Sequence, residues 1–368
     1  MEFVKSMKIG WNLGNSLDAH NNGNPSETAW GNPVINQALM HGVKARGFGA
    51  VRIPVTWINK IGAAPDYTID AAYLNRVAEV VEYVRVAGMK AIINIHHDGA
   101  DSHYWLSVNA ADITGPEKEA IDAKFTAVWR QIATKFKNTG DFLLFEAFNE
   151  LHDGNWGYQL TNKQLSAQGD RVNELNKIFV GAVRAVGGQN LNRYLVIPGL
   201  VTRASLTVQY LVLPPDTAEH KLIVTFHYYD PYDFTGSANW TEWGSNAIPS
   251  GNRAWANENY VKSTFDSVKN KFVANDIPVI IGEYGAVNQS GGGFAYRKYY
   301  MEYVTKHAHD CGFIPFYWDN AGFGTGSEKF GLLKRTDGSA YDASAQTILD
   351  VMMKAVTGNY TLDSITPP

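Results

Sequence analysis

Eight short apolar segments of strand-like length recur along the chain at intervals of about 30 to 55 residues. This repetition constrains the fold more than any other feature. None of the segments alternates cleanly between apolar and polar residues, which is typical of parallel strands covered on both faces. The segments lie at residues 8–12, 51–55, 91–96, 142–149, 194–199, 222–229, 278–285 and 313–318.

Helical patterns lie between these segments, at residues 68–88, 121–136, 171–188 and 347–356. In the first, Leu74, Val77 and Val81 recur at spacings of three and four, and Gly88 supplies a stop. Strand and helix alternating in one chain predict an α/β protein, a (β/α)8 TIM barrel. A doubly wound open sheet is the alternative, but no glycine-rich phosphate loop follows the first strand. We expect residues 1–368 to form one catalytic domain, with 359–368 as a C-terminal tail or linker stub.

Charge and composition exclude several classes of protein. The net charge is −4 with both signs scattered, so nucleic-acid binding is not expected. No stretch is apolar for long enough to span a membrane, and a single cysteine, Cys311, precludes an intrachain disulfide. The first residues lack the apolar stretch of a secretory signal. We expect a secreted, extracellular monomer whose signal peptide was removed or is left out of this chain.

Aromatic residues are abundant, with ten Trp, nineteen Tyr and seventeen Phe. Trp and Tyr carry a polar tip that needs a partner or water, so many should lie at the edge of the core or in a cleft. Flat aromatic faces in a polar cleft suit a sugar ring. Trp156 is the best candidate for such a platform. Core packing is an equal alternative for the other candidates, Trp57, Trp105, Trp240 and Trp243.

Polar side chains stand where the predicted strands end. In a barrel of this type the active site lies at the carboxyl ends of the strands, so these side chains should meet at one rim. They are Asn15, Arg52, His96, His97, Asn149, Glu150, His227, Tyr229, Glu283 and Trp318.

Glu150 and Glu283 are a pair of carboxylates at that rim. Hydrolysis of a glycosidic bond needs two such groups, and a separation of about 5 to 5.5 Å makes one a nucleophile and retains configuration. Repulsion and partial burial would keep one of them protonated. Arg52 can hold Glu283 ionised, and Tyr229 can donate to the same carboxylate. A structural ion pair is the alternative for these groups.

Two neighbours could contact a sugar directly. Asn149 can bond a sugar 2-hydroxyl, and Trp318 can form the floor under the reacting ring, with core packing as its alternative. His227 and Tyr229, two residues apart on one strand, should share a face of the barrel interior. A structural role is also open for His227.

His96 and His97 raise the question of a metal. Adjacent residues in a strand point to opposite faces, so this pair should chelate poorly. The first strand also lacks the H-x-H pattern expected of a metal-dependent barrel hydrolase. We therefore expect neither a metal nor another cofactor.

Taken together, these residues resemble glycoside hydrolase family 5, a group with many bacterial endo-β-1,4-glucanases. The matching stretches occur in the family's order across residues 8 to 350: GWNLGNSLDA, VRIPVTW, INIHHDG, FEAFNE, FHYYDP, IIGEYGA and PFYWDN. The resemblance implies a barrel and retaining hydrolysis, with Glu150 as acid/base and Glu283 as nucleophile. It also places supporting residues at Arg52, His96, His97, Asn149, His227, Tyr229 and Trp318. One departure is Leu151, where the family usually has proline.

The function expected from these features is endo-β-1,4-glucanase activity by double displacement. The substrates are β-glucan polysaccharides or oligosaccharides: cellulose, mixed-linkage β-glucan and, because the GWNLGNSLDA and HHDG stretches resemble that branch, xyloglucan. A β-mannanase or glucomannanase of the same family is the main alternative. A metal-dependent barrel hydrolase and a catalytically dead carbohydrate-binding barrel are the others.

Overall fold

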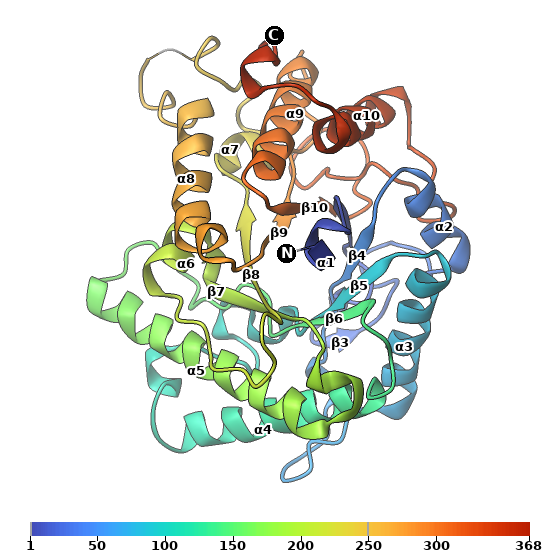
Figure 1. The fold of residues 1–368 in the computed structure, drawn as a ribbon, viewed down its shortest axis with the longest axis vertical. Helices are drawn as coiled ribbons and strands as arrows, with labels where there is room; N and C mark the ends of the chain where they lie inside the picture. Colours follow the sequence, from blue (N-terminus) through green and yellow to red (C-terminus); the bar gives the residue numbers. More distant parts are fainter. Residues whose placement is uncertain (1, 249) are drawn as a thin grey trace.

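Eight parallel strands form a closed barrel in the computed structural model, which describes residues 2–248 and 250–368 (Figure 1). The ring runs β1-β10-β9-β8-β7-β6-β5-β4, so β1 pairs with both β10 and β4 and closes it. The strands are β1 (Gly10–Leu13), β4 (Ala50–Ile53), β5 (Lys90–Ile93), β6 (Leu143–Glu146), β7 (Leu195–Arg203), β8 (Leu222–Tyr228), β9 (Val279–Tyr284) and β10 (Ile314–Asp319). Each overlaps one of the predicted segments, and the predicted barrel is confirmed.

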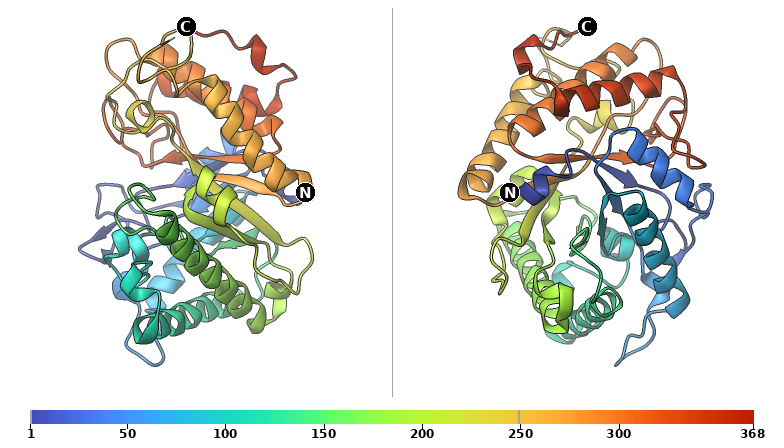
Figure 2. Two further views of the ribbon diagram at one scale, coloured as in Figure 1. Left: turned by 90° about the vertical axis from the view of Figure 1, so that its left-hand side faces the viewer. Right: turned by 45° about the vertical axis from the view of Figure 1, so that its right-hand side comes forward.

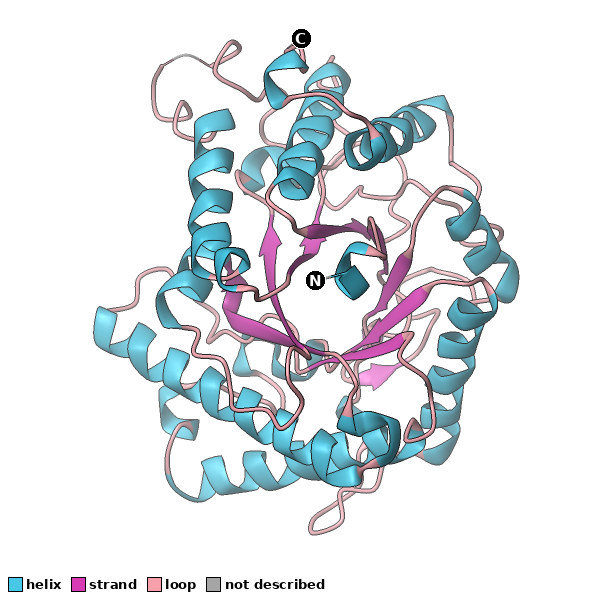
Figure 3. Ribbon diagram, in the orientation of Figure 1, coloured by secondary structure: helices cyan, strands magenta, loops and turns pink. Residues whose placement is uncertain are grey.

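Helices surround this ring on its outside, except for α1, which lies across one end of it (Figures 2 and 3). They are α1 (Glu2–Lys5), α2 (Gln37–Ala45), α3 (Ala71–Val86), α4 (Gly115–Lys135), α5 (Asn162–Val186), α6 (Ala204–Tyr210), α7 (Tyr232–Thr235), α8 (Glu258–Lys271), α9 (Phe294–Asp310) and α10 (Ala343–Thr357). The helices predicted from periodicity correspond to α3, α4, α5 and α10. A small hairpin of β2 (His20–Asn21) and β3 (Asn24–Pro25) follows β1. Within the described ranges, no helix combines the length and the apolar character needed to cross a membrane.

Local sequence explains where the predicted helices begin. The carboxylate of Asp70 accepts a hydrogen bond from the backbone N–H of Tyr73 and so caps α3. Thr161 and Gln164 form a capping box at the start of α5, each side chain bonding the backbone of the other. Unpaired N–H groups of the first turn are thereby satisfied, which fixes the ends of the connecting loops.

Helix α9 was not predicted, and its burial explains why. Every residue from 299 to 308 is buried, so the helix has no polar face that would reveal a 3.6-residue period. Its polar residues are paired: Glu302 Oε1 accepts hydrogen bonds from Lys354 Nζ at 2.6 Å and from Tyr360 Oη at 3.0 Å. Tyr360 belongs to the C-terminal segment 359–368, in which Ile365 is buried as well. That segment therefore packs on the barrel's outer layer.

The barrel interior is apolar at the amino ends of the strands. Ile92, Leu144 and Ile280 form a buried cluster there with residues from the other strands. Val4 of α1 and Met7 join the same cluster, so the N-terminal segment covers this end of the ring (Figure 3). The carboxyl ends of the strands are left for the polar residues.

Candidate active site

A buried arginine organises the carboxyl end of the barrel. The Arg52 side chain is fully buried, and its Nε lies 2.6 Å from Glu146 Oε2 while Nη1 lies 2.7 Å from Glu283 Oε1. Further hydrogen bonds run from Nη1 to Asn12 Oδ1, and from Nη2 to Glu146 Oε1 and Asn149 Oδ1. These interactions occupy all five N–H groups of the guanidinium. Its position is therefore fixed by residues from three other strands or their ends, namely β1, β6 and β9.

Glu146 was not identified from the sequence as a site residue. It is fully buried and binds Arg52 through both oxygens, and Asn94 Nδ2 donates to it at 3.3 Å. The available signal was a carboxylate inside the otherwise apolar run FLLFEAF, because a buried charge requires a partner. Asn12 of β1 and Asn94 were also missed.

The two predicted catalytic carboxylates lie next to each other. One oxygen of Glu150, one of Glu283 and a ring nitrogen of His227 all lie within 4.8 Å of one another. His227 Nδ1 is 2.5 Å from Glu150 Oε1 and 3.7 Å from Glu283 Oε2. Tyr229 donates from Oη to Glu283 Oε2 at 3.1 Å. The close approach of the Glu150 and Glu283 oxygens matches the geometry of retaining glycosidases, whose two carboxyl groups are too close together for a water molecule to lie between them.

The surroundings of the two carboxyl groups differ. Burial raises the pKa of Glu150 to about 7. Burial also raises the pKa of Glu283, but the charge of Arg52 and its hydrogen bond oppose that shift. Burial lowers the pKa of His227 to about 4, so the imidazole beside Glu150 is neutral at neutral pH. A single proton on the pair therefore resides on Glu150.

Asn149 has a defined amide orientation. Its Oδ1 accepts from Arg52 Nη2 at 2.8 Å, and a guanidinium can only donate. The amide nitrogen must therefore be the atom that faces away from the arginine. Asn149 is consequently oriented as a donor toward a ligand beside Glu150, as expected for a contact with a sugar hydroxyl.

His96 and His97 do not point to opposite faces, so that prediction is wrong. Strand β5 ends at Ile93, and the alternation of a strand no longer applies three and four residues later, at His96 and His97. Their ring centroids are 4.5 Å apart, and His97 Nε2 lies 3.7 Å from Asp18 Oδ2. The carboxylate of Asp18 already accepts hydrogen bonds from the backbone N–H groups of Asn15 and Ser16. It therefore serves the turn after β1.

Trp318 lies at the end of β10, stacked on His96 with ring centroids 6.0 Å apart and planes at 6°. It also belongs to a small buried cluster with Val287 and Phe330. The ring of Tyr229 packs against this cluster. Trp318 is thus linked to Glu283 through Tyr229, which packs on this cluster and donates to that carboxylate. Burial lowers the pKa of the neighbouring His96, so that its imidazole is neutral.

Asn15 lies two residues after the end of β1, where the sequence predicted it. Its backbone has φ of 57° and its N–H binds Asp18, so it shapes the turn after β1. Among the described residues, its side chain makes no hydrogen bond to Arg52, Glu150 or Glu283. Asn12, three residues earlier, is the asparagine of β1 that contacts Arg52.

Comparison with known proteins agrees with this site. Residues 15–324 match the Cellulase family, glycosyl hydrolase family 5. The chain belongs to glycosyl hydrolase family 5. Endoglucanase A of Paenibacillus barcinonensis is 38% identical over 373 residues, covering 96% of this chain and 90% of that protein. A broad-specificity endoglucanase from Bacteroides salanitronis has a structure with TM-score 0.93 and 46% identity, covering 97% and 95% of the two chains. The structure of a family 5 xyloglucanase from Paenibacillus pabuli matches with a TM-score of 0.88 and 40% sequence identity, covering 96% of this chain and 100% of that one.

Leu151 shows how this family 5 chain accommodates the absence of proline after the acid. The Leu151 side chain is buried and packs directly against the backbone of Gly99. The contact is so close that any side chain at position 99 would clash, since its Cβ would lie 2.3 Å from Leu151 Cδ2. The loop after Glu150 is therefore anchored by close packing of Leu151 against the loop after β5.

The candidate tryptophan platforms separate into three groups by burial. Trp57 and Trp243 are fully buried and belong to the core. Trp105 and Trp240 are partly buried and pack against the core, and Trp105 Nε1 donates to Asp98. Trp156 is 43% exposed and lies on the ring of His152, at 3.7 Å between centroids. Of these five residues, Trp156 presents the most open indole face on the loop that follows the acid.

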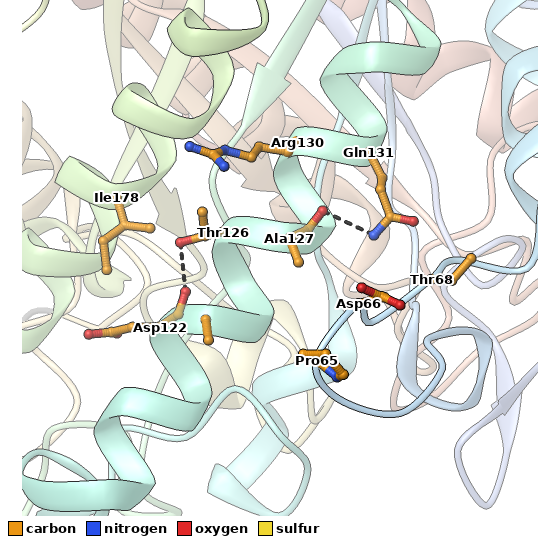
Figure 4. Close-up of a pocket in the computed structure, with 10 residues that line it drawn as sticks. Pro65, Asp66, Thr68, Asp122, Thr126, Ala127, Arg130, Gln131 and Ile178 are labelled. Carbon is orange, nitrogen blue, oxygen red and sulfur yellow. Dashed lines mark hydrogen bonds between the residues drawn. The ribbon is translucent and has the colours of Figure 1, made fainter.

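A separate hollow of about 640 Å³ lies on the outer surface, between the loop at Pro65 and helix α4 (Figure 4). Its lining includes Asp122, Arg130 and Gln131, but no aromatic ring and no residue predicted for the site. It therefore offers none of the chemistry found at the carboxyl end of the barrel.

Replacing Glu146 should test the role of the Arg52 network in this family 5 enzyme. In Glu146→Gln, Arg52 loses one of its two carboxylates and concentrates its charge on Glu283. We expect the acidic limb of kcat/KM to move to lower pH, and unfolding free energy to fall by about 1–3 kcal/mol. Glu82→Gln is the matched control, because Glu82 pairs with Arg85 on the surface, where both side chains are half exposed. It should change stability by less than about 1 kcal/mol. An unshifted acidic limb would show that Glu146 does not act on Glu283.

The protonation of Glu150 predicts a second pH effect. The acid must carry its proton in the free enzyme, so kcat/KM should fall about tenfold per pH unit once the pH exceeds about 7. In Glu150→Gln, assayed on an aryl cellobioside with a good leaving group, this basic limb should disappear. Initial rates from about pH 4 to about 9 measure both. Persistence of the limb in the variant would assign it to another group.

Proposed function

We propose that this protein is a retaining endo-β-1,4-glucanase that hydrolyses internal bonds of cellulose, mixed-linkage β-glucan and xyloglucan. The supporting observation is the pair formed by Glu150 and Glu283, whose oxygens approach within 4.8 Å in opposite electrostatic surroundings. One carboxyl group is held next to a cation and the other next to a neutral imidazole. Such a pair provides both the nucleophile and the acid of a double displacement.

In the first step Glu283 attacks the anomeric carbon and forms a glycosyl ester while Glu150 transfers its proton to the leaving oxygen. The bond from the anomeric carbon to that oxygen breaks as the ester bond forms. Arg52 and Tyr229 keep Glu283 oriented for attack through the bonds at 2.7 and 3.1 Å. The amide nitrogen of Asn149 donates to the 2-hydroxyl of the reacting sugar, a contact that strengthens in the transition state.

In the second step Glu150, now ionised, takes a proton from a water molecule that attacks the same carbon. The ester bond breaks, Glu283 is released as a carboxylate, and the product keeps its configuration. The change in charge at Glu283 between the two steps supports the change of role at Glu150. Loss of the negative charge at Glu283 in the ester lowers the pKa of Glu150 and makes it a base.

The substrate range is supported by relatives of different specificity. The Bacteroides salanitronis protein is described as a broad-specificity endoglucanase, and the Paenibacillus pabuli protein as a xyloglucanase. A further relative, with 33% identity and TM-score 0.85, is a lichenase whose mutant was solved with cellotetraose. We place this chain with the enzymes of broad specificity, and Trp156 as an aromatic platform for a sugar on the leaving-group side. Because such polymers cannot enter a cell intact, we propose that it acts outside the cell. We also propose that it acts as a monomer, since the proposed catalytic groups all come from one chain.

A panel of polysaccharides tests the proposed function. Carboxymethylcellulose, barley β-glucan and xyloglucan should be cleaved, and the viscosity should fall faster than reducing ends appear, because cleavage is internal. Glucomannan and xylan complete the panel. Preference for glucomannan over every glucan would instead favour a mannanase, and absence of cleavage on all five would contradict a hydrolase.

Azide distinguishes the roles of the two carboxylates. Glu283→Gly should lose hydrolysis, and azide should enter the vacated space and give an α-glycosyl azide from an activated β-glucoside. The same experiment on Glu150→Ala should give a β-glycosyl azide, because azide then attacks the intact glycosyl ester on Glu283. NMR of the products reads the configuration, and the reverse pattern would exchange the two roles.

A further inference from the structure

Three side chains with metal-binding chemistry gather on the outside of the barrel, where α8 and α9 lie side by side (Figure 1). They are Asp266 on α8, His307 in the last turn of α9 and Cys311, which caps α9; we call them the α8–α9 cluster. One donor atom from each lies within 4.8 Å of the other two. Sγ of Cys311 is 3.8 Å from Nε2 and 4.0 Å from Nδ1 of His307. The spacing of four residues places these two side chains on one face of the helix.

The α8–α9 cluster differs from the other groups of carboxylates and histidines in the described chain. Glu150 and Glu283 are bound by His227, Arg52 and Tyr229, and Asp18 is bound by backbone N–H groups. His307 and Cys311 are at least nine-tenths buried, yet the contacts between their side chains are only the long ones to sulfur.

The geometry of the α8–α9 cluster also resembles that around a metal ligand. The His307 ring lies parallel to Phe265, at 8° and 5.5 Å between centroids, which fixes its plane. Asp266 is exposed and leaves a route from solvent.

We propose that the α8–α9 cluster binds one zinc ion through the carboxylate of Asp266, the imidazole of His307 and the thiolate of Cys311, with water as the fourth ligand. Carboxylate, imidazole and thiolate are the ligands that zinc takes in proteins. Zinc–ligand bonds of about 2.0 to 2.3 Å in a tetrahedron put neighbouring ligand atoms about 3.5 Å apart. The spacing of 3.8 Å between sulfur and nitrogen requires only a small closure to reach that value.

Binding must displace a proton from sulfur. A cysteine buried away from cations is a thiol at neutral pH. One zinc–sulfur bond forms as one S–H bond breaks, and the proton leaves to solvent. Affinity should therefore rise with pH, by up to tenfold per unit.

Cobalt(II), which occupies zinc sites and absorbs visible light, is the probe. Chelator-treated full-length protein should bind one Co²⁺ and show a thiolate-to-cobalt charge-transfer band in the near ultraviolet, which Zn²⁺ removes. Cys311→Ser should lose the band, and Asp266→Asn should weaken cobalt binding at least tenfold. His309→Asn is the matched control, since His309 is an exposed histidine two residues beyond His307 on α9. It should leave the spectrum unchanged.

Absence of the band in the wild-type protein would overturn the proposal, as would a band that survives in Cys311→Ser. Equal binding by Asp266→Asn would remove Asp266 from the ligand set. Because Asp266 is exposed, this variant should fold even where replacement of the buried cysteine perturbs α9. Hydrolysis of barley β-glucan by every variant should equal that of the wild type, because the α8–α9 cluster contains none of the proposed catalytic groups. The outcome is therefore independent of the proposed glucanase activity.

Discussion

The active site depends on one buried cation. Arg52 lies in the barrel without solvent contact, and an unpaired guanidinium there would cost several kcal/mol. Glu146 and Glu283 compensate the charge from opposite sides, and Asn12 and Asn149 take the remaining N–H groups. Removing any of these partners leaves a polar atom unsatisfied in the interior. The same bonds that compensate the charge of Arg52 therefore fix the orientation of Glu283, the proposed nucleophile, and of the Asn149 amide next to Glu150, the proposed acid.

The division of labour between the two carboxylates follows from this arrangement. Both are buried, and burial alone would raise the pKa of each. Glu283 touches Arg52 and Tyr229, whereas Glu150 touches His227, which is too deeply buried to carry a charge at neutral pH. Two identical side chains thus differ in proton affinity because only one has a cation in contact. Two carboxyl groups in identical surroundings would share the proton equally, so neither would be reliably protonated as the acid or reliably ionised as the nucleophile.

The sequence predicted features that depend on local pattern or on position along a strand. Glu150, Glu283, Arg52 and Tyr229 stand at or near strand ends, and parallel strands bring their carboxyl ends together. Glu146 could not be found in this way, because what identifies it is a partner 94 positions away in the chain. The side chains of His96 and His97 were placed wrongly because the end of β5 depends on pairing with neighbours, not on the segment itself. Helix α9 was missed because burial on all sides removes its period.

Residues that stabilise the barrel and residues proposed for its chemistry lie at opposite ends of the strands. At the amino ends of the strands the interior is apolar and covered by α1, so substitutions such as Ile92→Ala act through cavities. At the carboxyl ends the interior is polar, and substitutions act through unsatisfied charges and altered pKa values. The outer helices form a third zone, joined to the barrel by packing and by side-chain hydrogen bonds such as that from Trp129 to the carbonyl of Ala147. A charge in the barrel interior is tolerated only where partners surround it. The buried polar residues therefore lie together, where they can pair with one another, and not scattered along the barrel. The carboxyl end is the one where the loops, and hence a polymer, can reach them.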